Sequence, residues 1–244
     1  MNKEIAQEVA YTTCRQLICE VSPELRAVTV EEVEENCFQI VFYYDGEVTE
    51  KKLDDYDCVG FEVSCITFET EALLEFENKL VRCDYPKPIP ARGILVYYRK
   101  EPQDLANIEK FQQEFFSPFA HRGEKYVSLH IRRVMQNALL GFVVPQLRSV
   151  GIGWTKEHLY VHFYFDGMIK KEYKKDVGRV MTVFSKYFPS DYVYVRIYQM
   201  DYPQPIPFST AIAYARKEKP IYEIPFGYWG FDSNGMLRKD PPES

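Results

Sequence analysis

The sequence contains none of the short motifs that identify a common enzymatic chemistry. It has no glycine-rich phosphate loop, no HExxH or GxSxG motif and no zinc-finger spacing. No apolar run reaches the ~20 residues that span a bilayer, and the start of the chain lacks a signal-peptide pattern. These absences favour a non-enzymatic protein of the cytoplasm that has no cofactor and no membrane partner.

Cysteine is absent after residue 83, and histidine is absent before residue 121. The six cysteines are Cys14, Cys19, Cys37, Cys58, Cys65 and Cys83, and no two of them form a CxxC pair. They are interpreted as reduced thiols, because the second half carries the same motifs without any cysteine. His158 and His162 share one face of a predicted strand, which is a weak metal signal and is more typical of surface or interface histidines.

What the chain does have is a long internal repeat. The segment Asp-Tyr-Pro-Lys-Pro-Ile-Pro at residues 84–90 returns as Asp-Tyr-Pro-Gln-Pro-Ile-Pro at 201–207. Each copy is followed by Tyr-x-Arg-Lys-Glu, ending at Glu101 and at Glu218. Further matches in the same order are Phe-Tyr-x-Asp-Gly at 42–46 and 163–167, and Pro-x-Leu-Arg-x-Val at 23–28 and 145–150. The chain is therefore a tandem duplication.

The hydrophobic pattern predicts an α+β fold for each copy. We expect two tandem copies of a helix–strand–strand–helix–strand–strand unit, with a mainly antiparallel sheet and helices packed on one face. The expected helices are near 4–20, 54–68, 126–142 and 174–188, and the expected strands near 25–32, 36–44, 74–83, 93–100, 147–153, 158–165, 191–200 and 209–216.

The expected organisation is a first repeat at 1–101, a linker with a helical pattern at 102–125, a second repeat at 126–218 and a C-terminal extension at 219–244. Large apolar residues between Tyr222 and Phe231 predict that the extension packs on the body. The proline segments read as stiff connectors between strands, since proline fixes φ and donates no hydrogen bond. A Pro-x-Pro segment that docks in an aromatic groove is the alternative.

Charge is distributed unevenly between the two copies. Residues 1–101 carry 21 acidic and 11 basic side chains, a balance of −10, whereas residues 102–244 carry 15 and 19, a balance of +4. An acidic half disfavours nucleic acid and favours a basic partner. The candidate partner-binding residues are Glu50, Asp54, Asp55 and Asp57, together with the acidic run at 31–35. Ordinary solubility charge is the alternative.

Two pairs of polar residues recur between the copies: Asp84 with Asp201, and Arg99 with Arg216. Each arginine could hold a carboxylate of its own repeat, for example Asp84 or Asp201. Alternatively, the four side chains could line a ligand site or an enzymatic cleft between the copies. Asp45 and Asp166 precede glycine, which is typical of turns.

These blocks, together with Asn-Ala-Leu-Leu at residues 137–140, resemble a group of small bacterial proteins about one unit long. The group is linked to colicin-type or contact-dependent toxin–immunity systems. The resemblance covers both halves but neither 102–125 nor 219–244, and it brings no catalytic residues. The first copy lacks the Ala-Leu-Leu motif.

Three functions are compatible with the sequence. The first is an immunity-type inhibitor that covers a basic toxin domain with an acidic face, since electrostatic complementarity gives specificity and fast association. The second is a scaffold or dimerisation protein that uses the paired copies. The third is an enzyme with its site between the copies. A neighbouring toxin gene favours the first, and an open cleft that joins the repeated Asp and Arg side chains favours the third. The sequence does not indicate an oligomeric state.

Overall fold

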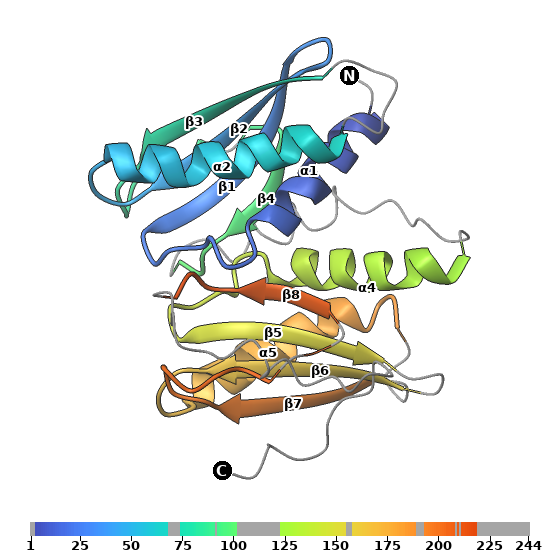
Figure 1. Ribbon diagram of the computed structural model, residues 1–244. Coiled ribbons are helices and arrows are strands. Elements are labelled where there is room, and N and C mark those ends of the chain that lie inside the picture. The colour runs from blue at the N-terminus through green and yellow to red at the C-terminus, as the bar shows by residue number, and fades with distance from the viewer. Residues whose placement is uncertain are drawn as a thin grey trace, which may run out of the picture.

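Each repeat begins with a helix that leads into a strand hairpin. In the computed structural model the elements of this part are α1 (Lys3–Gln16), β1 (Leu25–Glu34) and β2 (Cys37–Tyr44), then α4 (Gly123–Leu139), β5 (Leu147–Trp154) and β6 (Leu159–Phe165) (Figure 1). A second helix and two strands complete each repeat: α2 (Glu50–Thr67), β3 (Glu75–Arg82) and β4 (Ile94–Tyr98), then α5 (Lys171–Phe184), β7 (Val193–Gln199) and β8 (Ala211–Ala215). The predicted helix–strand–strand–helix–strand–strand order is confirmed in both copies.

The structure describes residues 3–67, 74–90, 92–101, 123–154, 158–188, 193–207, 209 and 211–218. Residues 102–122 of the predicted linker and the C-terminal extension at 219–244 lie outside this part, so the predictions of a linker helix and of a packed extension are not tested. Within the described residues, none of the helices is both long and apolar enough to cross a membrane.

The two four-stranded sheets have the same topology. The strand orders are β3-β2-β1-β4 and β7-β6-β5-β8. The two pairings that β1 or β5 makes in its sheet are antiparallel, which confirms the mainly antiparallel prediction. The remaining pairs, β2 with β3 and β6 with β7, are parallel. Between the two strands of each pair a helix carries the chain back to the end of the sheet at which the first strand starts.

Helices cover one face of each sheet, as predicted. Tyr56, Val59 and Val63 point inward from α2 at helical spacing, and each is at most 2 % exposed. The Tyr56 ring packs on Phe42 with 4.4 Å between centroids. In the second repeat Val177, Val180 and Phe184 of α5 do the same. Each such side chain stabilises the fold by about 1.5–3 kcal/mol when fully buried.

Helix boundaries are where the sequence prediction was wrong. α2 begins at Glu50 rather than near 54, and α5 spans Lys171–Phe184 rather than 174–188. α1 ends at Gln16 rather than near 20, because the chain turns at Cys19 with a φ of 70°. Tertiary contacts hold this turn, since the Cys19 amide donates to the Ala215 carbonyl of the other repeat at 2.9 Å.

The two repeats pack through reciprocal contacts. Cys19 bonds to Ala215, and its counterpart Gly141, with a φ of 71°, donates to the Tyr98 carbonyl at 2.9 Å. The amides of Lys217 and Lys100 donate to the carbonyls of Val21 and Val143 at 2.8 and 2.9 Å. This exchange of equivalent contacts has the form of a two-fold interface between identical subunits.

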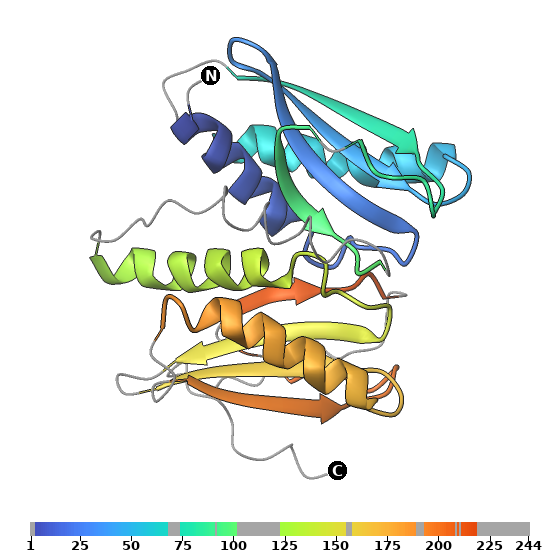
Figure 2. The ribbon, with the colours of Figure 1, turned by 180° about the vertical axis from the view of Figure 1, so that it is seen from behind.

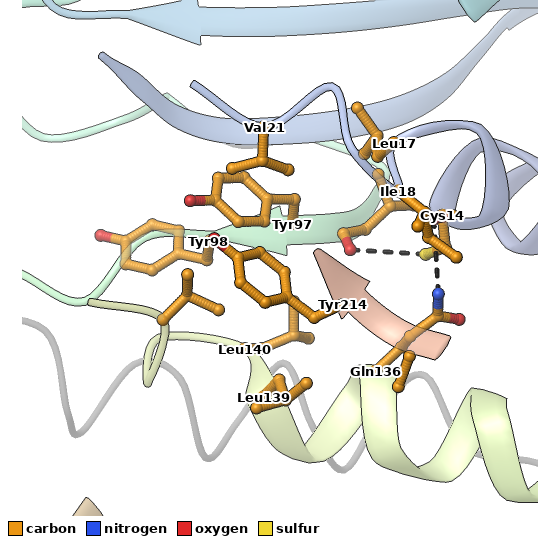
Figure 3. A pocket seen from close by; sticks show the side chains of 13 residues that line it. Cys14, Leu17, Ile18, Val21, Tyr97, Tyr98, Gln136, Leu139, Leu140 and Tyr214 are labelled. Carbon is orange, nitrogen blue, oxygen red and sulfur yellow. Dashed lines mark hydrogen bonds between the residues drawn. The ribbon is translucent and has the colours of Figure 1, made fainter. Parts of the chain in front are cut away.

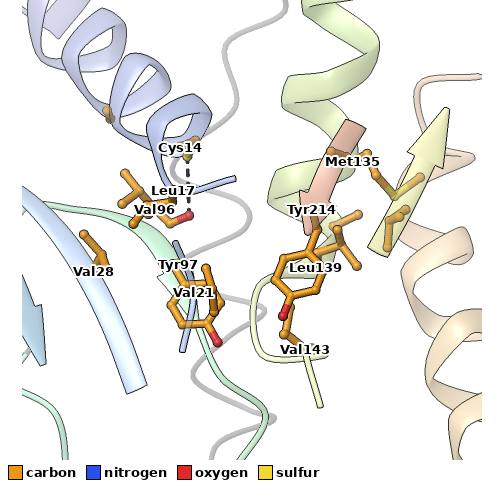
Figure 4. Close-up of a cluster of buried hydrophobic side chains, with 14 of the residues drawn as sticks. Cys14, Leu17, Val21, Val28, Val96, Tyr97, Met135, Leu139, Val143 and Tyr214 are labelled. Carbon is orange, nitrogen blue, oxygen red and sulfur yellow. Dashed lines mark hydrogen bonds between the residues drawn. The ribbon is translucent and has the colours of Figure 1, made fainter. Parts of the chain in front are cut away.

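One hydrophobic core runs through this contact. Leu17, Val96 and Tyr97 of the first repeat lie opposite Leu139 and Tyr214 of the second, and all five are buried (Figure 4). Seen from behind, the second repeat presents α4 and α5 to the viewer, while the first presents its sheet (Figure 2). On this side of the molecule, therefore, one repeat exposes its helices and the other exposes its sheet.

Candidate partner-binding surfaces

The predicted acidic residues lie in the first half of α2. Glu50, Asp54 and Asp57 are exposed, and their spacing of four and then three residues puts them on one face of the helix. Phe61, four residues further on, continues this face and is 69 % exposed. We call these four residues the acidic face of α2. Phe61 was not among the residues predicted for this surface, although its helical spacing from Asp57 is visible in the sequence.

Asp55 has a different role from its neighbours. It is half-buried and accepts a hydrogen bond from Lys217 Nζ of the other repeat at 2.9 Å. Asp176 of α5 stands in the same place and pairs with Lys100 of the first repeat. Asp55 therefore joins the repeats, whereas the side chains of Glu50 and Asp54 make no hydrogen bond or ion pair with any other described residue.

The acidic run at 31–35 is on the β1–β2 hairpin. Glu34 and Glu35 are exposed, whereas Glu31 and Glu32 are half-buried. The run belongs to a strand and its turn, so it is a separate surface from the acidic face of α2.

The equivalent helix of the second repeat has the opposite charge. Lys171, Lys174, Lys175 and Arg179 of α5 are all exposed. Asp55 and Asp176 occupy equivalent positions, because each pairs with the equivalent lysine of the other repeat. Counting back from these two aspartates, Lys171 corresponds to Glu50 and Lys175 to Asp54. The charge difference between the halves thus includes a sign reversal at matching positions of one helix.

The repeated arginines hold carboxylates, as one reading of the sequence predicted. Arg99 binds Asp45 at 2.5 Å, and Arg216 binds Asp166 at 2.7 Å. The hydrogen bond from Arg216 lowers the pKa of Asp166. The partner is the aspartate of the Asp-Gly turn rather than Asp84 or Asp201.

Asp84 and Asp201 stabilise the turns instead. Each accepts a hydrogen bond at 2.6 Å from the turn glycine of its repeat, Gly46 or Gly167. The Gly46 amide, followed by Arg82, lowers the pKa of Asp84. Both aspartates precede a Tyr-Pro peptide that is cis.

The repeated Asp and Arg side chains do not meet in one cleft. Arg99 and Arg216 line a small pocket between the repeats with Tyr97 and Tyr214, but Asp84 and Asp201 are not among its lining residues. Its volume of about 10 Å³ is about the size of one water, too small for a substrate. Both arginine side chains are 17 % exposed and already ion-paired. The geometry that would favour an enzymatic cleft is absent among these residues.

A second pocket between the repeats is almost entirely apolar. Leu17, Tyr97, Leu139 and Tyr214 point into it, and Cys14 lies at its edge with its thiol bonded to the Val96 carbonyl at 3.4 Å (Figure 3). Burial raises the pKa of Cys14 to about 12, so the thiol stays protonated near neutral pH. The volume of about 30 Å³ suits a packing defect in the interface rather than a ligand site.

The strongest polar contacts involve two buried arginines that sequence analysis did not identify. Arg26 makes a bidentate pair with Glu101, at 2.5 and 2.6 Å, and donates to the Cys83 and Lys87 carbonyls. Arg148 makes the same set of bonds to Glu218, Met200 and Gln204. An arginine at the same place in two apolar Leu-Arg-x-Val strands was the available signal.

Aromatic and histidine side chains gather on the sheet face that α4 and α5 leave open. Tyr160 and His162 of β6, with His158 directly before the strand, alternate with core residues, and Tyr194 and Tyr198 of β7 lie beside them. Burial, together with Arg196, lowers the pKa of His162. Among the described residues, no group of three or more His, Cys, Asp or Glu side chains could hold a metal ion.

Comparison with known proteins agrees with the internal repeat. The sequence pattern of the MafI2 immunity protein family matches residues 6–101 and matches again at residues 128–218. No curated protein matches the chain significantly. The two matches cover most of the chain and fall on the two structural repeats. This protein therefore belongs to the MafI2 immunity protein family and carries that family's unit twice.

Proposed function

We propose that this protein is a non-enzymatic immunity protein that neutralises a bacterial toxin by binding it, and that the acidic face of α2 contacts a basic surface of the toxin. Membership of the MafI2 immunity protein family supports the toxin-inhibitor role. The sign reversal between α2 and α5 is the observation that supports the choice of surface.

The electrostatics of α2 fit this role. Glu50, Asp54 and Asp57 point to solvent, so their field reaches a partner over about 8 Å at physiological ionic strength. Such a field steers an oppositely charged surface and raises the association rate. Phe61 supplies an exposed apolar group beside the charges, and a desolvated aromatic contact is the usual source of tight binding.

The proposal includes a cytosolic site of action. The thiols of Cys14, Cys19, Cys37, Cys58 and Cys83 are free. Free thiols, two of them buried, suit a reducing compartment.

The test uses the toxin that we expect to be encoded beside this gene. Cells that express the toxin domain should survive when the full chain is co-expressed, and the purified pair should form a complex whose association rate falls as salt rises. Absence of a neighbouring toxin, or toxicity unchanged by co-expression, would contradict the immunity role. A complex that forms without protection would support the alternative of a scaffold.

The variant Glu50→Lys/Asp54→Lys/Asp57→Lys tests the surface. It leaves Asp55 in place, because reversing Asp55 would break the contact with Lys217. We expect the association rate to fall about 10-fold or more at low salt. Glu50 lies in the first turn of α2, so reversing its charge costs about 0.3–1 kcal/mol of stability, which a melting curve will detect.

The matched control is Lys171→Glu/Lys174→Glu/Lys175→Glu on α5. These residues are exposed on the equivalent helix face, so the control changes as many charges without touching α2. It should leave the association rate unchanged or raise it. If the control alone abolishes binding, the second repeat carries the contact and the proposed surface is wrong.

A further inference from the structure

The open faces of the two sheets carry different side chains at equivalent positions. In the first repeat Gln39 pairs across the strands with Glu77, and their side chains bond to each other at 2.7 Å. In the second repeat Tyr160 pairs with Tyr194 in the same register. One step along, Val41 and Lys79 are replaced by His162 and Arg196. Polar side chains that bond to each other in one copy are therefore aromatic in the other.

The aromatic side chains form a continuous ridge along two strands. We define the aromatic ridge as Tyr160, His162, Tyr194, Arg196 and Tyr198. Tyr160 stacks on Tyr194 with 5.7 Å between ring centroids, and His162 meets Tyr198 edge-on at 5.5 Å. Tyr194 is 49 % exposed and Arg196 is exposed as well. Because β7 is an edge strand, the ridge follows the outer border of the sheet.

The ridge has a definite chemistry. None of the described residues on the open face of β5, β6 and β7 is acidic, and Arg196 adds a permanent positive charge. Tyrosine hydroxyls, imidazoles and a guanidinium offer hydrogen-bond donors. Arginine binds carboxylates through two parallel hydrogen bonds, and tyrosine gives rigid contact area at low entropic cost. A protein surface that presents carboxylates is therefore the complementary partner.

The ridge and the acidic face of α2 look toward the same side of the molecule. In Figure 1, α2 lies in front of its sheet, whereas the second sheet lies in front of α5. Figure 2, from behind, shows the reverse order in both repeats. A partner bound over α2 can therefore extend across the second repeat and reach the ridge without going around the molecule.

We propose that the aromatic ridge is a second contact for the toxin and that it receives a carboxylate-bearing part of the toxin surface beside the basic part held by α2. This inference rests on the proposed function, because the occupant is the same toxin. It assigns the second repeat a role in choosing the toxin. Only a toxin whose surface carries both charges in the right order satisfies both contacts at once.

Single-stranded nucleic acid is the other occupant that aromatic side chains can bind, through base stacking. Here the tyrosine rings stack on one another in pairs, at 20° for Tyr160 with Tyr194 and 15° for Tyr164 with Tyr198. One face of each ring is therefore occupied. The hydroxyl edges that remain suit hydrogen bonds to a protein surface better than stacking with bases.

The experiment measures the dissociation constant for the toxin domain of the co-expression test. Tyr160→Ala/Tyr194→Ala should weaken binding about 30-fold or more, as expected for the loss of an aromatic anchor. Arg196→Glu should weaken it at least about 10-fold, and more than Arg196→Gln, because the reversed charge repels carboxylates. Arg196 is exposed, so these two variants will fold even if the double tyrosine variant does not.

The matched control changes the equivalent positions of the first repeat. Gln39→Ala/Glu77→Ala and Lys79→Glu lie on the open face of the other sheet, which looks toward the opposite side. They should change the dissociation constant by less than about 3-fold, within the range of ordinary surface substitutions. A loss as large as that of the ridge variants would overturn the assignment.

Failure of this inference is distinguishable from failure of the proposed function. If the unchanged protein binds and neutralises the toxin while all ridge variants keep its affinity, the ridge is no toxin contact and the immunity role stands. If the unchanged protein does not bind, the proposed function fails first.

The last experiment measures binding of a labelled 20-nucleotide single strand to the unchanged protein and to the ridge variants. Binding to this strand that the ridge variants lose, with toxin affinity unchanged, would overturn the inference in favour of nucleic acid.

Discussion

Arg26 and Arg148 occupy the same place in the two repeats, and each makes the same bonds to a glutamate and two carbonyls. Glu50 and Lys171 also occupy the same place in their repeats, on the outer face of the second helix, yet their charges are opposite. The pairs differ in exposure. The arginine side chains are 1 % exposed, whereas Glu50 and Lys171 are exposed.

The buried polar contacts that the fold requires are the same in both repeats, whereas the exposed surfaces differ between them. The buried Arg–Glu pairs and the Arg99–Asp45 and Arg216–Asp166 contacts occur in both copies, because removing one partner leaves a desolvated charge. Outer helix faces and open sheet faces have no such requirement. The acidic face of α2 and the aromatic ridge, which we assign to partner binding, both belong to these unconstrained surfaces.

The largest expected effect is on the buried arginines. Arg26→Ala should destabilise the protein by about 3–5 kcal/mol, because it leaves the Glu101 carboxylate, 3 % exposed, with only its 3.2 Å contact to Arg99. Arg148→Ala should cost less, roughly 2–4 kcal/mol, because Glu218 is 21 % exposed and gains water. Urea unfolding of the two variants measures the difference directly.

The control for this prediction removes both charges. Arg26→Met/Glu101→Gln should be more stable than Arg26→Ala, since no ionised group is left buried alone. If Arg26→Ala and Arg148→Ala were both as stable as the parent, the view that these contacts are shared because the fold depends on them would be wrong.

Most of the fold could be predicted from the sequence, because the repeat shows the pattern of each helix and strand in two copies. The matching blocks at 42–46 and 163–167 end at the same strand–turn junction, and each helix shows apolar residues at helical spacing. The parallel pairing of β2 with β3 was not predicted, since pairing direction depends on where the crossover helix returns the chain. Helix ends were misplaced where contacts with the other repeat decide them, as at Cys19.

The candidate surfaces were only partly predictable. The charges of α2 were visible as residue types, but the separation of Asp55 from Glu50 and Asp54 depends on Lys217, which lies far along the chain. The aromatic ridge needs the register between β6 and β7 before Tyr160 and Tyr194 become neighbours. Such pairings are tertiary information that no local pattern contains.

The two ion pairs between the repeats should also differ in their contribution to stability, but by less than the buried arginines. Lys100→Ala removes a partner of Asp176, whose side chain is 8 % exposed, and should cost about 1–3 kcal/mol. Lys217→Ala should cost at most about 1 kcal/mol, because Lys217, Glu20 and Asp55 are all about one-third exposed. Thermal melts of the two variants in low and high salt measure this. Equal losses would show that the two contacts are equivalent despite their different burial.

The smallest effects are expected at the cysteines, which only the first repeat contains. Cys58 is exposed and Cys37 half-buried, so changing either to Ser should alter stability by at most about 0.5 kcal/mol.

Cys14 should behave differently from these two cysteines, because it is buried. Burial raises its pKa to about 12, so its reactive thiolate forms only when this part of the protein opens. In a variant that retains Cys14 as its sole cysteine, labelling at pH 8 should be slow in the native protein and should speed up in parallel with unfolding in urea. That labelling rate reports the opening of the structure around Cys14, which lies at the edge of the pocket between the repeats. Arg148→Ala should accelerate it only if unfolding of the second repeat also opens the first, as the shared core between Leu17, Tyr97 and Tyr214 predicts. An unchanged rate would show that the repeats unfold independently.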